Sequence, residues 1–289
     1  MQINIGLCPH VGKLLVLPAR PSEHRQLFRR GGFLSASNAS YPQRRPHLTY
    51  TDGTPFWWLA DTWWSAPSAS PHLAQFTAAL AWRAKQGFTA VQIHGSRGFG
   101  RSNVSAAVQH PFDITFWQKQ DGYYEAAAAH DMLLVVGFSR GDLLTRFPHS
   151  VAVLPTIFAY HMARFGAFPI SYLITQEYNC NTYSTRPDIP RLEALGQLLH
   201  NADPYQRALT MHPAVLHLDT KDAWSSSWYQ FAMAQQGHLV NNNGVTLEAL
   251  LNFSQQAHQL GFPAVNAEAN YEGFVRGWQV SVNLLQLYR

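Results

Sequence analysis

The chain has 289 residues, of which 46% are hydrophobic, 13% aromatic and 13% charged, and its formal net charge is +4. One (β/α)8 barrel typically needs about 250 residues, so the length fits a single large domain and is short for two. Residues 1–46 hold seven Lys or Arg and one acid, which gives +6, so the rest of the chain carries −2. A nearly neutral body lacks the clustered cations of a nucleic-acid groove, and no apolar run approaches the roughly 18 residues of a membrane helix. We therefore expect no nucleic-acid partner and no membrane partner.

The two cysteines, Cys8 and Cys180, form no CxxC motif, and no His/Cys group has the spacing of a metal site. We expect no metal and no cofactor. The run Leu14–Leu17 is too short for the core of an export signal. The sequence leaves the compartment and the oligomeric state open.

Residues 1–30 show no hydrophobic period, and we interpret them as a basic N-terminal arm that precedes one barrel domain over residues 31–289. Gly32–Ser37 and His47–Tyr50 are predicted as two short strands. The pair Asp52-Gly53 follows them and predicts a turn, because Gly tolerates a positive φ.

Strand-like and helix-like segments then alternate. The predicted strands are Phe56–Ala60, Thr89–His94, Met132–Phe138, Ile170–Thr175, Ala208–Met211, Ser227–Met233 and Pro263–Asn266. The predicted helices are Pro71–Gln86, Phe116–His130, Val151–Phe165, Ile189–Asn201, Leu247–Leu260 and Phe274–Tyr288. This alternation is typical of a parallel sheet covered by helices. An open doubly wound sheet is the alternative, but the first strand of the body is followed by Asp61-Thr-Trp-Trp64 and no Gly-rich phosphate loop, which favours a (β/α)8 TIM barrel.

Polar side chains recur just after the predicted strands, where a barrel carries its active site. They are, in chain order, Asp61, His94, Arg140, Gln176, Glu177, His212, Gln235, His238 and Glu268. Any one of them has little weight, because loops are generally polar. Their recurrence after seven strands indicates one shared site.

Two of the seven Glu residues stand out by position, because Glu177 follows the fourth strand and Glu268 the seventh. Carboxylates on these strands lie across a barrel mouth from each other. Glycoside hydrolysis uses such a pair, with one acid to protonate the leaving oxygen and one carboxylate to attack or to activate water. Gln176 could bind a sugar hydroxyl, and Tyr271 could keep Glu268 ionised. Of four nearby tryptophans that could stack on sugar rings, at least two are expected in the core; the four are Trp57, Trp58, Trp63 and Trp64.

Other chemistries fit less well. His94-Gly-Ser-Arg-Gly98 is not the GxSxG elbow of a serine hydrolase. A metal site would have to use His212, Asp219 and His238, which lack HxH or HExxH spacing.

Five segments resemble the apiosidase-like family in order. Tyr50–Trp64 (YTDGTPFWWLADTWW) is similar to the family's opening phrase, and Pro263–Glu272 (PAVNAEANYE) to its closing one. Three segments between these two match the family less specifically; they are Arg83–Gln92, Tyr172–Asn179 and Gln235–His238. The resemblance covers roughly residues 31–289.

This resemblance implies a (β/α)8 glycoside hydrolase that acts on pectic side chains of plant cell walls. Glu177 would be the acid/base and Glu268 the nucleophile or general base. The substrate-binding residues would be Asp61, Trp63, His94, Arg140, Gln176, His212, Gln235, His238 and Tyr271. Because the carboxylates follow strands four and seven, we expect retention of anomeric configuration.

The chain departs from the family pattern near its end, because it stops at Arg289 without a clear eighth strand. The predicted barrel is therefore truncated after the helix that follows strand seven. A fragment, a partner chain, or a strand from the arm at Lys13–Leu17 would each account for this. A non-catalytic carbohydrate-binding barrel and an arm that binds polyanions remain alternative functions.

Overall fold

The computed structural model describes residues 34–36, 46–64, 66, 72–95, 114–138, 148–179, 189–214, 223–235 and 247–268. The predicted basic arm, both cysteines and the predicted helix Phe274–Tyr288 lie outside these residues. The predicted strand at Lys13–Leu17 lies outside them as well.

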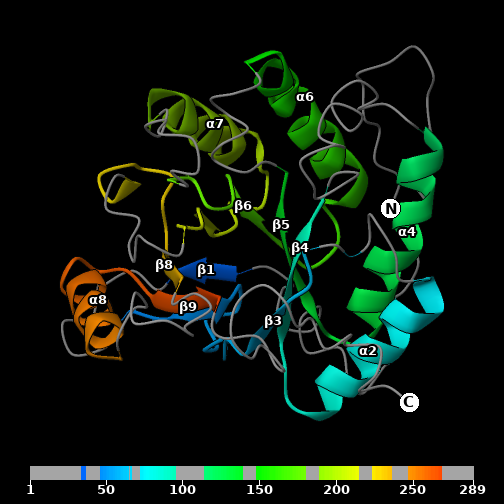
Figure 1. Cartoon of the computed structure of the whole chain (residues 1–289), viewed down its shortest axis with the longest axis horizontal. Coiled ribbons are helices and arrows are strands. Elements are labelled where there is room, and N and C mark those ends of the chain that lie inside the picture. The colour runs from blue at the N-terminus through cyan, green and yellow to red at the C-terminus, as the bar shows by residue number, and fades with distance from the viewer. Residues whose placement is uncertain are drawn as a thin grey trace, which may run out of the picture.

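The centre of the molecule is a parallel sheet whose strands follow chain order (Figure 1). Its five strands are β3 (Ala60–Thr62), β4 (Ala90–His94), β5 (Leu133–Gly137), β6 (Ile170–Leu173) and β7 (Leu209–Thr210). A second parallel pair joins β8 (Ala232–Gln235) to β9 (Ala264–Glu268). A doubly wound sheet reverses its strand order at a switch point. Unbroken chain order in the five-stranded sheet therefore supports the barrel-type architecture.

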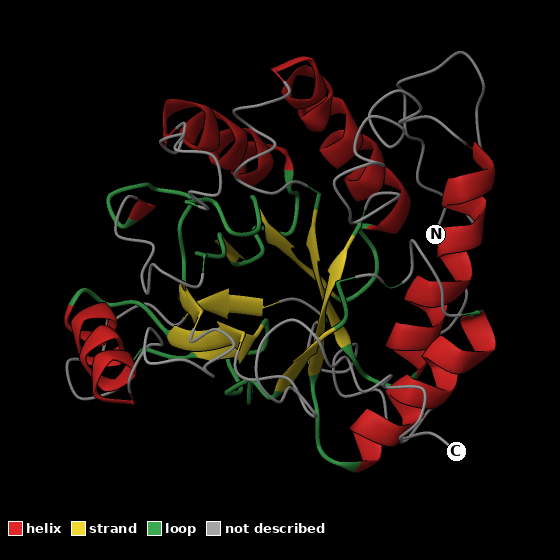
Figure 2. Ribbon diagram, in the orientation of Figure 1, coloured by secondary structure: helices red, strands yellow, loops and turns green. Residues whose placement is uncertain are grey.

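Helices lie around the outside of the strands (Figure 2). They are α2 (Leu73–Lys85), α4 (Ile114–Ala129), α6 (Pro148–Phe165), α7 (Ile189–Ala202) and α8 (Leu247–Gln259). Two of the connections after helices turn at a glycine, because Gly87 and Gly261 both have φ of +87°. Side chains would be strained there, which explains why glycine marks the predicted helix ends.

Alternate residues of each strand separate into two apolar layers, as the two-residue period of a strand requires. Val91 and Leu134 belong to the outer layer that packs against the helices. Ala90 and Leu133 belong to the inner layer. The inner layer draws residues from six strands and so forms a shared interior.

A short hairpin contributes to one end of this interior. Strands β1 (Leu34–Ala36) and β2 (Leu48–Tyr50) pair antiparallel, and Leu48 and Phe56 join the inner apolar layer. The predicted turn is confirmed: Gly53 has φ of +83°, and the Asp52 carboxylate accepts from the Thr54 amide at 2.9 Å.

The two sheets approach each other at both sides. Leu209 of β7 forms a parallel bridge with Tyr229, just before β8. On the other side, the Thr62 hydroxyl of β3 lies 3.5 Å from the Ala267 carbonyl of β9. Within the described ranges, no main-chain ladder joins β9 to β3. The described strands and helices thus confirm a parallel α/β fold of the barrel type. Closure of the barrel and the missing eighth strand stay predictions.

Two strand positions differ from the sequence-based prediction. The first body strand is Ala60–Thr62 instead of Phe56–Ala60, because Phe56 bonds the Leu48 carbonyl and packs under the hairpin. The sixth is Ala232–Gln235, because the preceding Trp228 lies in a turn that packs on Gly196 of α7.

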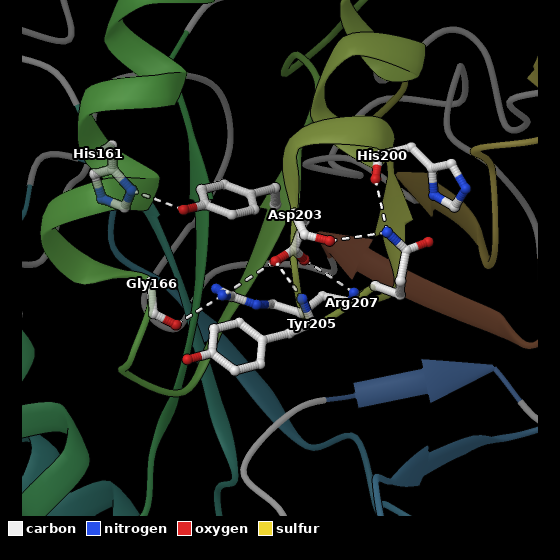
Figure 3. A network of polar contacts seen from close by, with 8 residues as sticks. His161, Gly166, His200, Asp203, Tyr205 and Arg207 are labelled. Carbon is white, nitrogen blue, oxygen red and sulfur yellow. Dashed lines mark hydrogen bonds and ion pairs between the residues drawn. The ribbon is translucent and has the colours of Figure 1, made fainter. Parts of the chain in front are cut away.

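A buried polar network lies between α6, α7 and the start of β7 (Figure 3). The Arg207 guanidinium contacts the Asp203 carboxylate at 3.3 Å and donates to the Gly166 carbonyl at 2.7 Å, and both charged side chains are at most 1% exposed. Gly166 directly follows α6, so Arg207 also faces the negative end of that helix dipole. Beside this pair, His161 lies between the hydroxyls of Tyr124, at 2.6 Å, and Tyr172, at 3.0 Å.

Candidate active site

Glu268 ends β9 with its side chain only 5% exposed. The Trp64 indole N–H donates to Oε1 at 3.4 Å, and His212 Nε2 lies 3.4 Å from Oε2. The ladder between β8 and β9 shifts register at Ala234/Gln235, opposite Glu268. Such irregularities re-aim side chains next to active sites. The turn after β3, the end of β7 and the end of β9 thus bring three side chains together.

His212 is fully buried and presents its ring to Trp64 edge to face, with centroids 5.5 Å apart. Burial lowers the pKa of His212 from 6.5 to about 4, against a smaller opposing contribution from the Pro213 backbone. The imidazole is therefore neutral near pH 7. A neutral imidazole still has one N–H, which can donate to a carboxylate without adding a charge.

Among the described residues, four buried glutamines carry side-chain atoms without hydrogen-bond partners; Gln120 is on α4, and the other three follow or belong to the strands. In those three, the atoms are both amide atoms of Gln176, the Oε1 of Gln235 and the Oε1 of Gln92. Gln235 pairs in register with Glu268, and Gln92 donates to the Ala267 carbonyl, so both lie beside the carboxylate. An unpaired buried amide costs about 1–3 kcal/mol. Water molecules or the hydroxyls of a ligand can satisfy such groups.

Gln176 and Glu177 follow β6 in a tight turn. The Tyr178 amide bonds the His212 carbonyl at 3.0 Å, which joins this turn to the residue that faces Glu268. Gly137 of β5 leaves room for Gln176, because an added Cβ there would lie 2.7 Å from the Gln176 amide nitrogen. Glu177 has φ of +41°, in the left-handed region. Strained backbone of this kind concentrates at functional sites.

His94 is the last residue of β4 and is buried. The strand period places it on the same face as Gln92, toward the interior. Its partner in the ladder is Gly137, which packs against the Gln176 side chain. The structure therefore places His94, Gln176, His212, Gln235 and Glu268 at the carboxyl ends of the strands.

Two predicted substrate-binding residues lie elsewhere. The Asp61 carboxylate pairs with Arg83 of α2 at 2.7 Å, on the helix side of β3. Trp63 packs edge to face on Phe76 of α2, with centroids 5.6 Å apart, in the outer apolar layer. The structure thus gives these two side chains partners in the fold and brings Trp64, instead of Trp63, to Glu268. Arg140, His238 and Tyr271 lie outside the described residues.

Sequence reasoning missed Gln92 and Thr62. The alternation of Ala90–His94 identifies Gln92 as an interior polar residue two positions before His94, and this signal was available. The role of Thr62 depends on a contact with β9 some 205 residues further along the chain, which no local pattern indicates.

No group of three or more His, Cys, Asp or Glu with metal-binding geometry occurs in the part of the chain that the structure describes. Among the same residues, none of the helices combines the length and the apolar character needed to cross a bilayer.

Solved structures with this architecture include glycoside hydrolases. A glycoside hydrolase is 18% identical and superposes with a TM-score of 0.64 over 85% of this chain and 58% of its own. A family 5 glycoside hydrolase from Bacteroides vulgatus ATCC 8482 is 19% identical, with a TM-score of 0.63 over 85% and 55%. A GH5 cellulase from an Icelandic hot spring isolate is 14% identical, with a TM-score of 0.57 over 84% and 74%. These likenesses establish the fold, and the chain spans somewhat over half the length of the first two.

By sequence, no curated protein matches this chain. The family model "Apiosidase-like, catalytic domain" matches residues 42–285, which is most of the chain. That range includes the Trp64, His212 and Glu268 group and confirms the predicted family. The chain belongs to the apiosidase-like family, because the model of that family's catalytic domain matches most of it.

Proposed function

We propose that this chain hydrolyses a glycosidic bond in a pectic side chain of plant cell walls, with retention of configuration, and that Glu268 and Glu177 are its catalytic carboxylates. The observation that carries the proposal is the environment of Glu268. Its carboxylate meets an indole N–H and a neutral imidazole beside buried amides that lack partners.

Glu268 suits the role of nucleophile. Both carboxylate oxygens have a polar neighbour, so the side chain is held in one orientation while it faces the interior. In a retaining reaction, one oxygen attacks the anomeric carbon and forms a glycosyl ester, which water then hydrolyses. The neutral His212 adds no cation that would pair permanently with the nucleophile.

Glu177 suits the role of acid/base. It follows β6, is half-buried, and sits on a turn that is tied to His212 through the Tyr178 amide. In the first step it protonates the leaving oxygen, and in the second it takes a proton from the attacking water. Retention requires its carboxyl to lie about 5–5.5 Å from that of Glu268 in the working enzyme.

The amides supply the recognition of sugar hydroxyls. Gln176 can both donate and accept through its two unpaired atoms, and Gln235 can accept through Oε1. A bound sugar would form hydrogen bonds with these buried groups. Binding would then remove the free-energy cost of leaving them unpaired. The pectic substrate class is proposed from the resemblance to the family, and His94, Arg140, His238 and Tyr271 remain proposed members of the subsite.

The test is product release from pectic oligosaccharides and aryl glycosides by the wild type and Glu268→Gln. We expect the variant to lose at least about a thousandfold in kcat while it keeps its fold and its sugar binding. Glu248→Gln, on the exposed face of α8, is the matched control and should behave as the wild type. NMR of the first-formed anomer would report retention or inversion.

Sugar binding by a folded wild type without turnover of any substrate would reject hydrolysis and favour a non-catalytic carbohydrate-binding barrel. Turnover that survives in Glu268→Gln would reject the assignment of the nucleophile.

A further inference from the structure

Gln92 is a buried residue of β4 that takes part in a contact across the interior. Its side-chain nitrogen donates to the main-chain carbonyl of Ala267 and lies 3.0 Å from the Thr62 hydroxyl. The Thr62 hydroxyl is 3.5 Å from the same carbonyl. Two side chains from β3 and β4 thus converge on the carbonyl of the residue that precedes Glu268.

The orientation of the Gln92 amide follows from chemistry. A carbonyl only accepts hydrogen bonds, so the NH2 group must face Ala267. The Oε1 atom is then forced to the other side, where it is buried without a hydrogen-bond partner. An unpaired buried acceptor is unfavourable, so the bond to Ala267 fixes the amide in an orientation that leaves its oxygen without a partner.

The pairing of strand β9 explains why this contact can influence the position of Glu268. On one side it forms a ladder with β8, and that ladder shifts register opposite Glu268. On the other side the described residues show no ladder to β3. On the side that faces β3, the Gln92 and Thr62 side chains contact the main chain next to Glu268.

We propose that Gln92 is a positioning residue that holds the Glu268 carboxylate against Trp64 and His212. It touches no reacting atom and acts through the Ala267 carbonyl. The effect on catalysis rests on the function proposed above, whereas the effect on the position of Glu268 does not. A misplacement of about 1 Å costs on the order of 100-fold in rate.

The test compares Gln92→Met with Gln120→Met. Methionine keeps the length of glutamine and removes both polar atoms. Gln120 is equally buried, but it lies on α4 away from the interior. We expect Gln92→Met to lower kcat by about 10–100-fold with KM within about threefold. Gln120→Met should leave both constants unchanged.

A second readout needs no substrate. The indole N–H signal of Trp64 in 15N NMR reports its bond to Glu268, and a crystal structure gives the 3.4 Å contact directly. We expect the indole signal to move and the contact to lengthen in Gln92→Met but not in Gln120→Met. Thr62→Val keeps the bond from Gln92 to the Ala267 carbonyl. We expect it to change the indole signal and the Trp64–Glu268 contact less than Gln92→Met does. Should Gln92→Met not fold, Gln92→Asn, which is one methylene too short to reach, takes its place.

An unchanged indole signal and an unchanged Glu268 contact in folded Gln92→Met would overturn the proposal. An equal loss of kcat in both Met variants would overturn it as well, because the effect would then be general loss of packing. If the wild type turns over no substrate, the proposed function fails, and the NMR and crystallographic readouts still decide whether Gln92 positions Glu268.

Discussion

Two buried histidines lie in regions of opposite character. Both ring nitrogens of His161 contact tyrosine hydroxyls. The neighbouring Arg207 is paired with Asp203 (Figure 3). His212 faces Glu268 at 3.4 Å, beside glutamines that have unpaired atoms. The contacts of His161 are with side chains of the fold, and such buried networks stabilise a fold. His212 instead faces a carboxylate at the carboxyl ends of the strands, so the second region is the one proposed to act on substrate.

Removal of one charge from the paired region should have the largest effect on stability. Arg207→Met leaves Asp203 buried without its cation, and loss of one partner of such a pair costs about 3–5 kcal/mol. Urea unfolding would measure this loss, and kcat per folded molecule should stay unchanged. Lys119→Met, an exposed cation on α4, is the control and should change stability by less than about 0.5 kcal/mol. A loss no larger than the control's would contradict a stabilising role for the pair.

His161 should make the fold sensitive to acid. Burial, with a smaller contribution from the Arg207 charge, lowers its pKa from 6.5 to about 3. The unfolded chain therefore takes up a proton that the folded chain does not, and stability falls as pH drops from about 6.5 toward 3. Between about pH 7 and pH 4 the loss is about 3 kcal/mol.

The variant His161→Gln should reduce this acid dependence. The quantity to compare is the change in unfolding free energy between the two pH values, because the substitution itself also alters stability at pH 7. The same dependence in wild type and variant would show that His161 does not carry it.

His212→Gln should lower activity by about 10–100-fold, because the imidazole lies 3.4 Å from the Glu268 carboxylate and a displacement of that carboxylate by about 1 Å costs on the order of 100-fold in rate. Steady-state kinetics on the substrate that the wild type hydrolyses would measure it. His161→Gln in the same assay is the matched control, since its effect should fall on stability and leave kcat per folded molecule unchanged. Equal activity losses in the two variants would remove the functional difference between the regions.

The smallest expected effect separates two adjacent tryptophans. Trp64→Phe removes the indole N–H that reaches Glu268 and should lower kcat about fivefold, in line with about 1 kcal/mol for one hydrogen bond. Trp63→Phe alters packing against Phe76 and should instead lower stability by about 1 kcal/mol. A loss of kcat in Trp63→Phe together with a loss of stability alone in Trp64→Phe would contradict this assignment and support Trp63 as the substrate-binding residue.

Most of the fold was predictable because strands and helices have local periods. The run of seven strands, their parallel order and the glycine turns at Gly53, Gly87 and Gly261 all follow from patterns a few residues long. Membership of the family also followed from short phrases, and the match over residues 42–285 confirms it. The strand near Phe56 was placed wrongly, because a buried apolar run fits a strand and a packed loop equally well.

The recurrence of polar residues just after the predicted strands also identified Glu268, His212 and Gln176 as candidates from the sequence alone. Only the tertiary structure decided which neighbours these side chains meet. Trp64 and Glu268 are 204 residues apart, and Asp61 pairs with Arg83 on a helix outside the sheet. A local period fixes the face of a regular strand, but beyond the strand end the backbone is irregular. There, contacts between distant segments decide whether a side chain supports the fold or faces the site.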